Sequence, residues 1–183
     1  MNFSGRTVYF VGIKGTGMAS LAILLKASGA LVSGCDSAEY FATDELLASH
    51  GIAVHKGFSP SALDRDADMV IHSSAYPVEL PILAEAASVG LALYSYPQFL
   101  SHLSTLGDSY AVAGTHGKTT TVALTSYLLS TGTLKAFPFY SIFGSHVLGR
   151  TQPFFQGSEC ALFEACEYQD HFLSYQLRGA LVT

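Results

Sequence analysis

Residues 114–120 read Gly-Thr-His-Gly-Lys-Thr-Thr, and their setting predicts how the chain folds around them. The apolar run Tyr110–Ala113 precedes them, and Leu124, Tyr127 and Leu128 follow at the i, i+3, i+4 spacing of a helix. Glycines let the backbone wrap closely, so that several N–H groups point at phosphate oxygens, and a helix N-terminus adds a favourable dipole. The segment therefore predicts a strand, a phosphate-binding loop and a helix.

The loop is shorter than the common ATPase pattern G-x-x-x-x-G-K-[ST], because Val112 stands where the first glycine would fall. A surface turn with a solvated lysine is the alternative interpretation. In a phosphate site, Lys118 would reach the terminal phosphates and the Thr119 hydroxyl would ligate Mg²⁺. We expect the ATP-binding residues to be Gly114, Thr115, His116, Gly117, Lys118, Thr119 and Thr120.

The first 107 residues alternate short β-rich runs with helical periodicity. Strands are expected at 7–11, 30–34, 52–54, 69–72 and 91–94, and helices at 18–28, 43–49, 81–89 and 97–103. Such alternation predicts a parallel sheet with right-handed crossovers. We therefore expect an α/β, Rossmann-like domain at 1–107, followed by an incomplete P-loop α/β domain at 108–183.

The second domain has fewer residues than the first and fewer elements that the sequence predicts. Strands are expected at 160–164 and 179–183, whereas the aromatic, glycine-containing segment 138–153 is left unassigned. A parallel sheet needs cover on both faces, and this region lacks the residues for it. We expect the chain to be a fragment of a longer protein.

A second glycine loop, Gly12-x-x-Gly15-x-Gly17, follows the first expected strand, and Asp36 ends the next one. This is where a dinucleotide-binding loop and its ribose-binding acid would lie, but the fingerprint is G-x-G-x-x-G. NAD binding and a glycine turn used only for close packing both stay open. A diphosphate at this helix N-terminus is reasonable for any nucleotide. The hydroxyl residues Ser73 and Ser74 follow another strand and could bond phosphate or sugar oxygens.

Composition narrows the class of protein. The chain is 49% hydrophobic and 13% charged, which is typical of a well-buried globular protein. The formal net charge of -5 and the lack of a basic run argue against nucleic-acid binding. No apolar stretch is long enough for a membrane span, and the N-terminus lacks a signal-peptide core. Three cysteines, an odd number, favour free thiols in the cytoplasm, and the histidines predict no zinc site.

Taken together, these segments resemble the Mur ligases of bacterial cell-wall synthesis over the whole chain. The most specific part is Ala113–Thr121, and the supporting parts are Gly12–Met18, Ser33–Asp36, Ser73–Ala75 and Glu164–Glu167. The resemblance implies an enzyme of three domains. The first domain holds a UDP-sugar, the central domain binds ATP, and the third brings the amino acid. The implied UDP-sugar-binding residues are Gly12, Gly15, Thr16, Gly17, Met18, Asp36, Ser37, Ser73, Ser74 and Ala75.

The implied activity is ATP-dependent joining of L-alanine to UDP-N-acetylmuramate through an acyl phosphate, in the full-length enzyme only. Lys118 and His116 are the implied catalytic residues, and Glu167 is an implied substrate-side residue. Thr119 is implied to ligate one Mg²⁺, and Glu164 to help hold a second metal between the carboxylate and the γ-phosphate. Alternatives are a recycling ligase that attaches a murein tripeptide to the same sugar nucleotide, a non-catalytic nucleotide binder, and an NAD(P) oxidoreductase.

Three positions depart from the family pattern. Lys14 stands where a glycine is usual and could add a cation to the diphosphate contacts. Cys166 replaces an aspartate, which removes a carboxylate near the metal. The stretch 94–96, Tyr-Ser-Tyr, stands where arginine is common.

Overall fold

The computed structural model describes the chain except for residues 1, 132–136, 145–153 and 166–171. The chain divides into two compact units within helix α4 (Tyr96–Ser104), one formed by Phe3–Phe99 and the other mainly by Leu100–Thr183. The boundary expected from the sequence lies slightly later, at residue 107. Each unit is described by itself.

The first unit contains the expected alternation of strands and helices. Its strands are β1 (Thr7–Val11), β2 (Leu31–Asp36), β3 (Ala53–Lys56), β4 (Met69–His72) and β5 (Ala92–Ser95). Its helices are α1 (Thr16–Ala27), α2 (Thr43–Ser49), the 3-10 turn η1 (Pro60–Ala62), α3 (Pro81–Ser88) and the start of α4 (Tyr96–Ser104). The expected elements are therefore present, with shifts of one or two residues at most ends.

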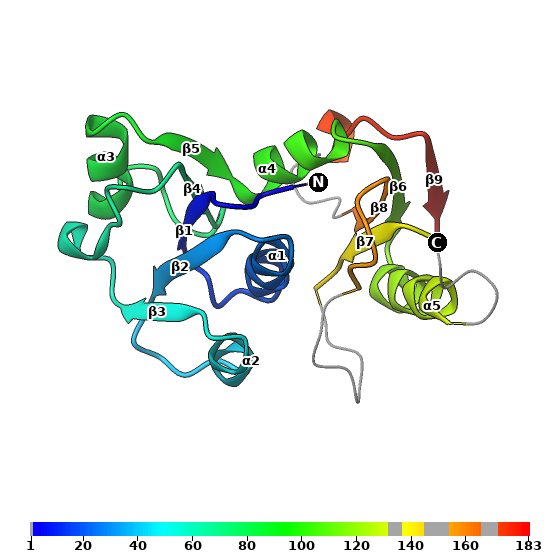
Figure 1. Cartoon of the computed structure of the whole chain (residues 1–183), viewed down its shortest axis with the longest axis horizontal. Helices are drawn as coiled ribbons and strands as arrows, with labels where there is room; N and C mark the ends of the chain where they lie inside the picture. Colours follow the sequence, from blue (N-terminus) through cyan, green and yellow to red (C-terminus); the bar gives the residue numbers. More distant parts are fainter. Residues whose placement is uncertain (1, 132–136, 145–153, 166–171) are drawn as a thin grey trace. The chain divides into compact units, whose positions relative to one another are not determined.

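All five strands are parallel, in the order β3-β2-β1-β4-β5. Figure 1 shows α1 and α2 on one face of this sheet and α3 on the other. Successive strand residues point to opposite faces, so Tyr9 and Val11 of β1 join the core cluster that includes Ile82 and Leu83 of α3. This two-sided cover is typical of a doubly wound, Rossmann-like fold and confirms the predicted fold class.

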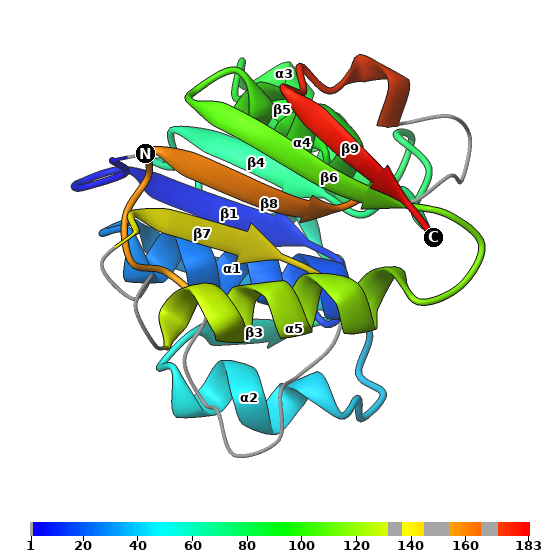
Figure 2. The same cartoon turned by 90° about the vertical axis from the view of Figure 1, so that its right-hand side faces the viewer.

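The second unit is also built on a parallel sheet. Its strands are β6 (Asp108–Ala113), β7 (Phe139–Ile142), β8 (Cys160–Glu164) and β9 (Gly179–Val182), and helix α5 is Lys118–Ser130. Their order is β7-β8-β6-β9, and Figure 2 shows them side by side in this sequence. Val122 of α5 joins Val112, Phe139 and Leu162 in one core cluster.

Two features of this unit differ from the sequence interpretation. Strand β7 lies in the segment left unassigned, of which 145–153 falls outside the described residues. Helix α5 forms as predicted, but the apolar residues used to recognise it, Leu124, Tyr127 and Leu128, are 57%, 51% and 59% exposed. The buried residues of α5 are instead Val122 and Ser126, which lie one helical turn apart on the face that packs on the sheet.

Over the part of the chain that the structure describes, no helix is long and apolar enough to cross a membrane. Two of the three cysteines, Cys35 and Cys160, are buried free thiols, as expected, and Cys166 lies outside the described residues. Burial raises the pKa of the Cys35 thiol to about 11, so this thiol is protonated and unreactive near neutral pH.

Candidate functional site

The first glycine loop lies where the strand order of the first sheet reverses, between β1 and β4. Gly12 has φ +83, a left-handed conformation that favours glycine. A Cβ on Gly12 would lie 2.8 Å from Ser73 Cβ and 2.7 Å from Tyr76 Cε2. The loops after β1 and β4 are therefore in contact at the carboxyl ends of the strands, where open α/β sheets bind their ligands.

Helix α1 begins directly after this loop. Its N-cap is Gly15, which has no side chain that could accept a hydrogen bond from the N–H groups of the first turn. Thr16 is exposed at this end, Met18 is buried in the core, and Gly17 is closely approached by the Tyr96 hydroxyl. The first-turn N–H groups thus form the kind of helix terminus that accepts an anion.

Asp36, at the end of β2, is buried and is used within the protein. Its Oδ2 accepts a hydrogen bond from Lys14 N at 2.7 Å. Its Oδ1 accepts hydrogen bonds from Ser37 N at 2.7 Å and from the Tyr76 hydroxyl at 3.0 Å. The carboxylate therefore ties together the loops that follow β1, β2 and β4.

Tyr76 is the residue of this site that the sequence analysis missed. Its ring packs on Phe58 with a centroid distance of 4.6 Å. Burial and the negative charge of Asp36 raise the pKa of the Tyr76 phenol to about 12, so it remains a hydrogen-bond donor over the neutral range. The available signal was its position, directly after the predicted binding loop Ser73–Ala75. In that loop, Ser73 Oγ accepts a hydrogen bond from Ala75 N at 3.2 Å, and Ser74 is exposed.

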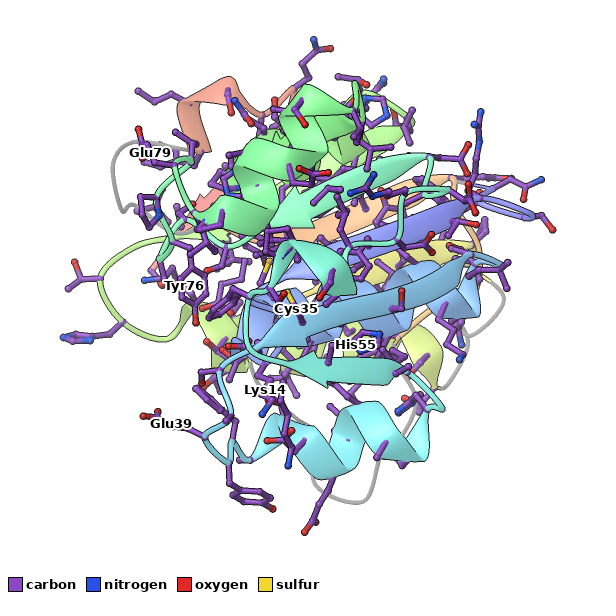
Figure 3. All side chains as sticks on the ribbon, turned by 90° about the vertical axis from the view of Figure 1, so that its left-hand side faces the viewer. Lys14, Cys35, Glu39, His55, Tyr76 and Glu79 are labelled. Atoms are coloured by element: carbon purple, nitrogen blue, oxygen red, sulfur yellow. The ribbon has the colours of Figure 1, made fainter. Side chains whose placement is uncertain are left out.

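Lys14 does not add a cation to the surface of the glycine loop. Its ammonium is buried and lies beside the loop that carries Glu39, as Figure 3 shows. It forms a salt bridge with Asp44 and donates hydrogen bonds to backbone carbonyls. The expectation of an extra phosphate-facing charge is therefore wrong for this conformation, because the charge is already neutralised inside the protein.

The second glycine loop joins β6 to α5. Gly117 is the N-cap of α5 with φ +81, and within the described residues it offers no side-chain cap. Gly114 has φ +126, and a Cβ there would lie 2.1 Å from the backbone oxygen of Thr183. Only glycine fits such an approach. Lys118 Nζ donates a hydrogen bond to the Gly114 carbonyl oxygen at 2.6 Å. The Lys118 side chain therefore spans the loop from the start of α5 back to Gly114.

The two predicted metal ligands, 45 residues apart in sequence, are in direct contact. Thr119 Oγ1 donates a hydrogen bond to Glu164 Oε1 at 2.6 Å, and Glu164 Oε2 accepts one from Gly144 N at 3.0 Å. A hydroxyl and a carboxylate are oxygen donors of the kind that Mg²⁺ prefers. The donor set therefore fits Mg²⁺, although the described residues contain no cluster of three His, Cys, Asp or Glu side chains for a metal.

The remaining predicted residues of this loop lie at its exposed rim. Thr115, His116 and Thr120 are exposed, and the His116 carbonyl accepts a hydrogen bond from the Thr183 hydroxyl. Glu167 falls outside the described residues, as does Cys166, so the structure places neither of them.

Each unit has a parallel sheet and a glycine loop at a helix N-terminus, an arrangement typical of nucleotide-binding proteins of the α/β class. The profile of the Mur ligase family, catalytic domain, matches residues 7–106, which is more than half of the chain. The chain belongs to the Mur ligase family.

Curated relatives agree with this membership. UDP-N-acetylmuramate–L-alanine ligase of Treponema pallidum is 40% identical over 98% of this chain. The enzyme of the same name from Desulfitobacterium hafniense is 38% identical over 96%. The chain spans 37% and 38% of the length of these two relatives.

Solved structures show the same fold. The UDP-N-acetylmuramate:L-alanyl-gamma-D-glutamyl-meso-diaminopimelate ligase of Neisseria meningitides matches 97% of this chain and 61% of its own, with a TM-score of 0.79 and 27% identity. The UDP-N-acetylmuramate-alanine ligase of Thermotoga maritima matches 96% of this chain and 40% of its own, with a TM-score of 0.80. At 23% identity the second likeness concerns the fold alone.

Proposed function

We propose that the whole protein is a cytoplasmic UDP-N-acetylmuramate–L-alanine ligase, to which this chain contributes a UDP-sugar-binding unit (1–107) and the phosphate loop of an ATP-binding unit (108–183). The observation that carries the proposal is the contact between Thr119, at the phosphate loop, and Glu164, at the end of β8. The names of the curated relatives support the choice of L-alanine and UDP-N-acetylmuramate as substrates.

The chemical difficulty of this reaction is that two anions must meet, since the muramyl carboxylate attacks the γ-phosphate of ATP to give an acyl phosphate and ADP. The amine of L-alanine then displaces phosphate. Lys118 and the loop N–H groups would neutralise the phosphate charge, and His116 would lie near the reacting carboxylate. Mg²⁺ supplies charge neutralisation between carboxylate and phosphate when bound, and Thr119 and Glu164 are the residues that would hold it.

In the first unit, the diphosphate of the sugar nucleotide would meet the N-terminus of α1 through Gly15, Thr16 and Gly17. Ser73 and Ser74 would donate to phosphate or sugar oxygens. Asp36 would serve this site by ordering the surrounding loops, since both of its oxygens accept hydrogen bonds from the protein.

A tripeptide ligase acting on the same sugar nucleotide is the second candidate, because the Neisseria structure with that name is also similar over 97% of this chain. A coupled assay of phosphate release with the product of the complete reading frame would separate the two. Turnover with L-alanine but not with the tripeptide is expected, and the reverse would favour the second candidate.

Lys118→Ala in that enzyme should abolish turnover, because the phosphate charge loses its cation, and should leave UDP-N-acetylmuramate binding unchanged in calorimetry. Near-normal turnover would remove Lys118 from the mechanism. If wild-type protein bound NAD but not the UDP-sugar, the assignment of the first unit would be wrong.

A further inference from the structure

The side chain of Lys14 leaves the glycine loop and enters the protein. Only 3% of it is exposed, and its Nζ lies 3.0 Å from Asp44 Oδ1. The same Nζ donates to the carbonyl oxygens of Ser37, at 3.1 Å, and Glu39, at 2.7 Å. An ammonium has three hydrogen-bond donors, so these three acceptors use all of them.

The backbone of Lys14 is held as firmly as its side chain. Its N–H donates to the buried Asp36 carboxylate, and its carbonyl accepts a hydrogen bond from the Thr43 hydroxyl. The ammonium also lies over the Phe41 ring, 5.5 Å from the centroid. One residue of the glycine loop therefore contacts most of the segment 37–44, which comprises the connection from β2 to α2 and the first two residues of α2.

We propose that Lys14 is a positioning residue that fixes the segment 37–44 against the glycine loop and thereby sets the affinity of the first unit for the diphosphate of its sugar nucleotide. The inference rests on the proposed function of that unit. The Lys14 ammonium holds the Ser37 carbonyl close to the loop from which α1 begins.

A direct contact between Lys14 and phosphate is the competing explanation. It requires the ammonium to give up a salt bridge and two carbonyl hydrogen bonds, and to leave a buried position for solvent. Because each of these interactions involves a charged group shielded from water, losing all three favours the internal arrangement. The two explanations differ in how binding responds to salt.

The test compares Lys14→Met with a matched variant in the same unit, Lys26→Met, which removes an ammonium that donates to the Gly51 carbonyl at 2.7 Å. Calorimetry with UDP-N-acetylmuramate, at a temperature where all proteins are folded, should show binding at least about ten-fold weaker for Lys14→Met. Lys26→Met should bind like wild type. Amide exchange should accelerate over 37–44 in Lys14→Met alone.

The dependence of affinity on ionic strength should be the same in wild type and Lys14→Met, because the variant removes no phosphate contact. A shallower dependence would identify a direct contact and overturn the proposal. Unchanged affinity with unchanged exchange over 37–44 would also overturn it while leaving the proposed function intact. Absence of binding by wild type would remove both.

If Lys14→Met does not fold, Asp44→Asn takes its place, because the amide oxygen can still accept a hydrogen bond while the charge that pairs with Lys14 is lost. Weaker binding with faster exchange over 37–44 is again expected. Wild-type behaviour of that variant would contradict the positioning role.

Discussion

Removing one hydroxyl tests the network around the first glycine loop. In Tyr76→Phe the ring and its contact with Phe58 remain, but the hydrogen bond to the buried Asp36 carboxylate is lost. A hydrogen bond to a charged group contributes about 1.5 to 3 kcal/mol, and the partial exposure of Tyr76 favours the lower end. We expect a loss of about 1.5 kcal/mol in the free energy of unfolding at neutral pH.

The same hydroxyl makes this difference depend on pH. The pKa of the Tyr76 phenol is about 12 in the folded protein against 10.0 for an unperturbed tyrosine, a gap worth at most about 2.7 kcal/mol. Solvent screening of the partly exposed ring reduces this to about 1 kcal/mol. Because the folded pKa is the higher one, the stabilisation is complete below pH 10 and is lost as the pH rises towards 12.

Urea denaturation of wild type and Tyr76→Phe, at several values between about pH 8 and pH 11, measures both effects. The stability difference should be largest at the lower pH and shrink as the pH passes the pKa of free tyrosine. Tyr40→Phe is the control, since Tyr40 donates a hydrogen bond to Glu45 at an exposed site and should contribute far less. A difference that is absent at neutral pH, or constant with pH, would refute the role given to Tyr76.

Two further predictions concern close packing and the metal ligands. Gly34→Ala would place a Cβ 2.5 Å from the Phe10 carbonyl oxygen of the adjacent strand, so urea denaturation should show a loss of about 3 kcal/mol. Gly90→Ala, with φ +78 and no neighbour within 4 Å, should cost only about 1 kcal/mol, and an equal loss would contradict the steric argument. In the whole enzyme, Glu164→Gln should lower turnover at least about 100-fold without weakening UDP-N-acetylmuramate binding, as should Thr119→Val; unaffected turnover would exclude a metal role.

Strand and loop positions were predictable because they depend on local sequence. The run at 160–164 is apolar and ends in a glutamate, and β8 has these bounds. Thr119 follows β6 and Glu164 ends β8, and their contact depends on the pairing of these two strands, which the sequence did not predict. Strand β7 was missed because its Phe139–Ile142 run lies among prolines, glycines and other aromatic residues that give no clear period.

Side-chain direction was less predictable, because it depends on contacts that are distant in sequence. Leu124, Tyr127 and Leu128 give α5 an apolar stripe, yet the face packed on the sheet carries Val122 and Ser126. The direction of the charged Lys14 side chain was equally hard to predict. A lysine in a glycine loop suggests a phosphate ligand, and only the position of Asp44 and of the carbonyls around it shows where the ammonium goes.

Asp36 shows how an acid after the second strand can serve a nucleotide site in two physically different ways. A ribose-binding carboxylate must keep an oxygen open to a ligand hydroxyl, whereas the oxygens of Asp36 accept hydrogen bonds from Lys14 N, Ser37 N and the Tyr76 hydroxyl. Its burial strengthens these bonds, since the charge has little competing water. Three of its acceptor positions are thus used within the protein, which makes Asp36 an organiser of the surrounding loops. Among the described residues, the N-terminus of α1 has no side-chain cap, and a helix terminus of this kind favours phosphate rather than ribose.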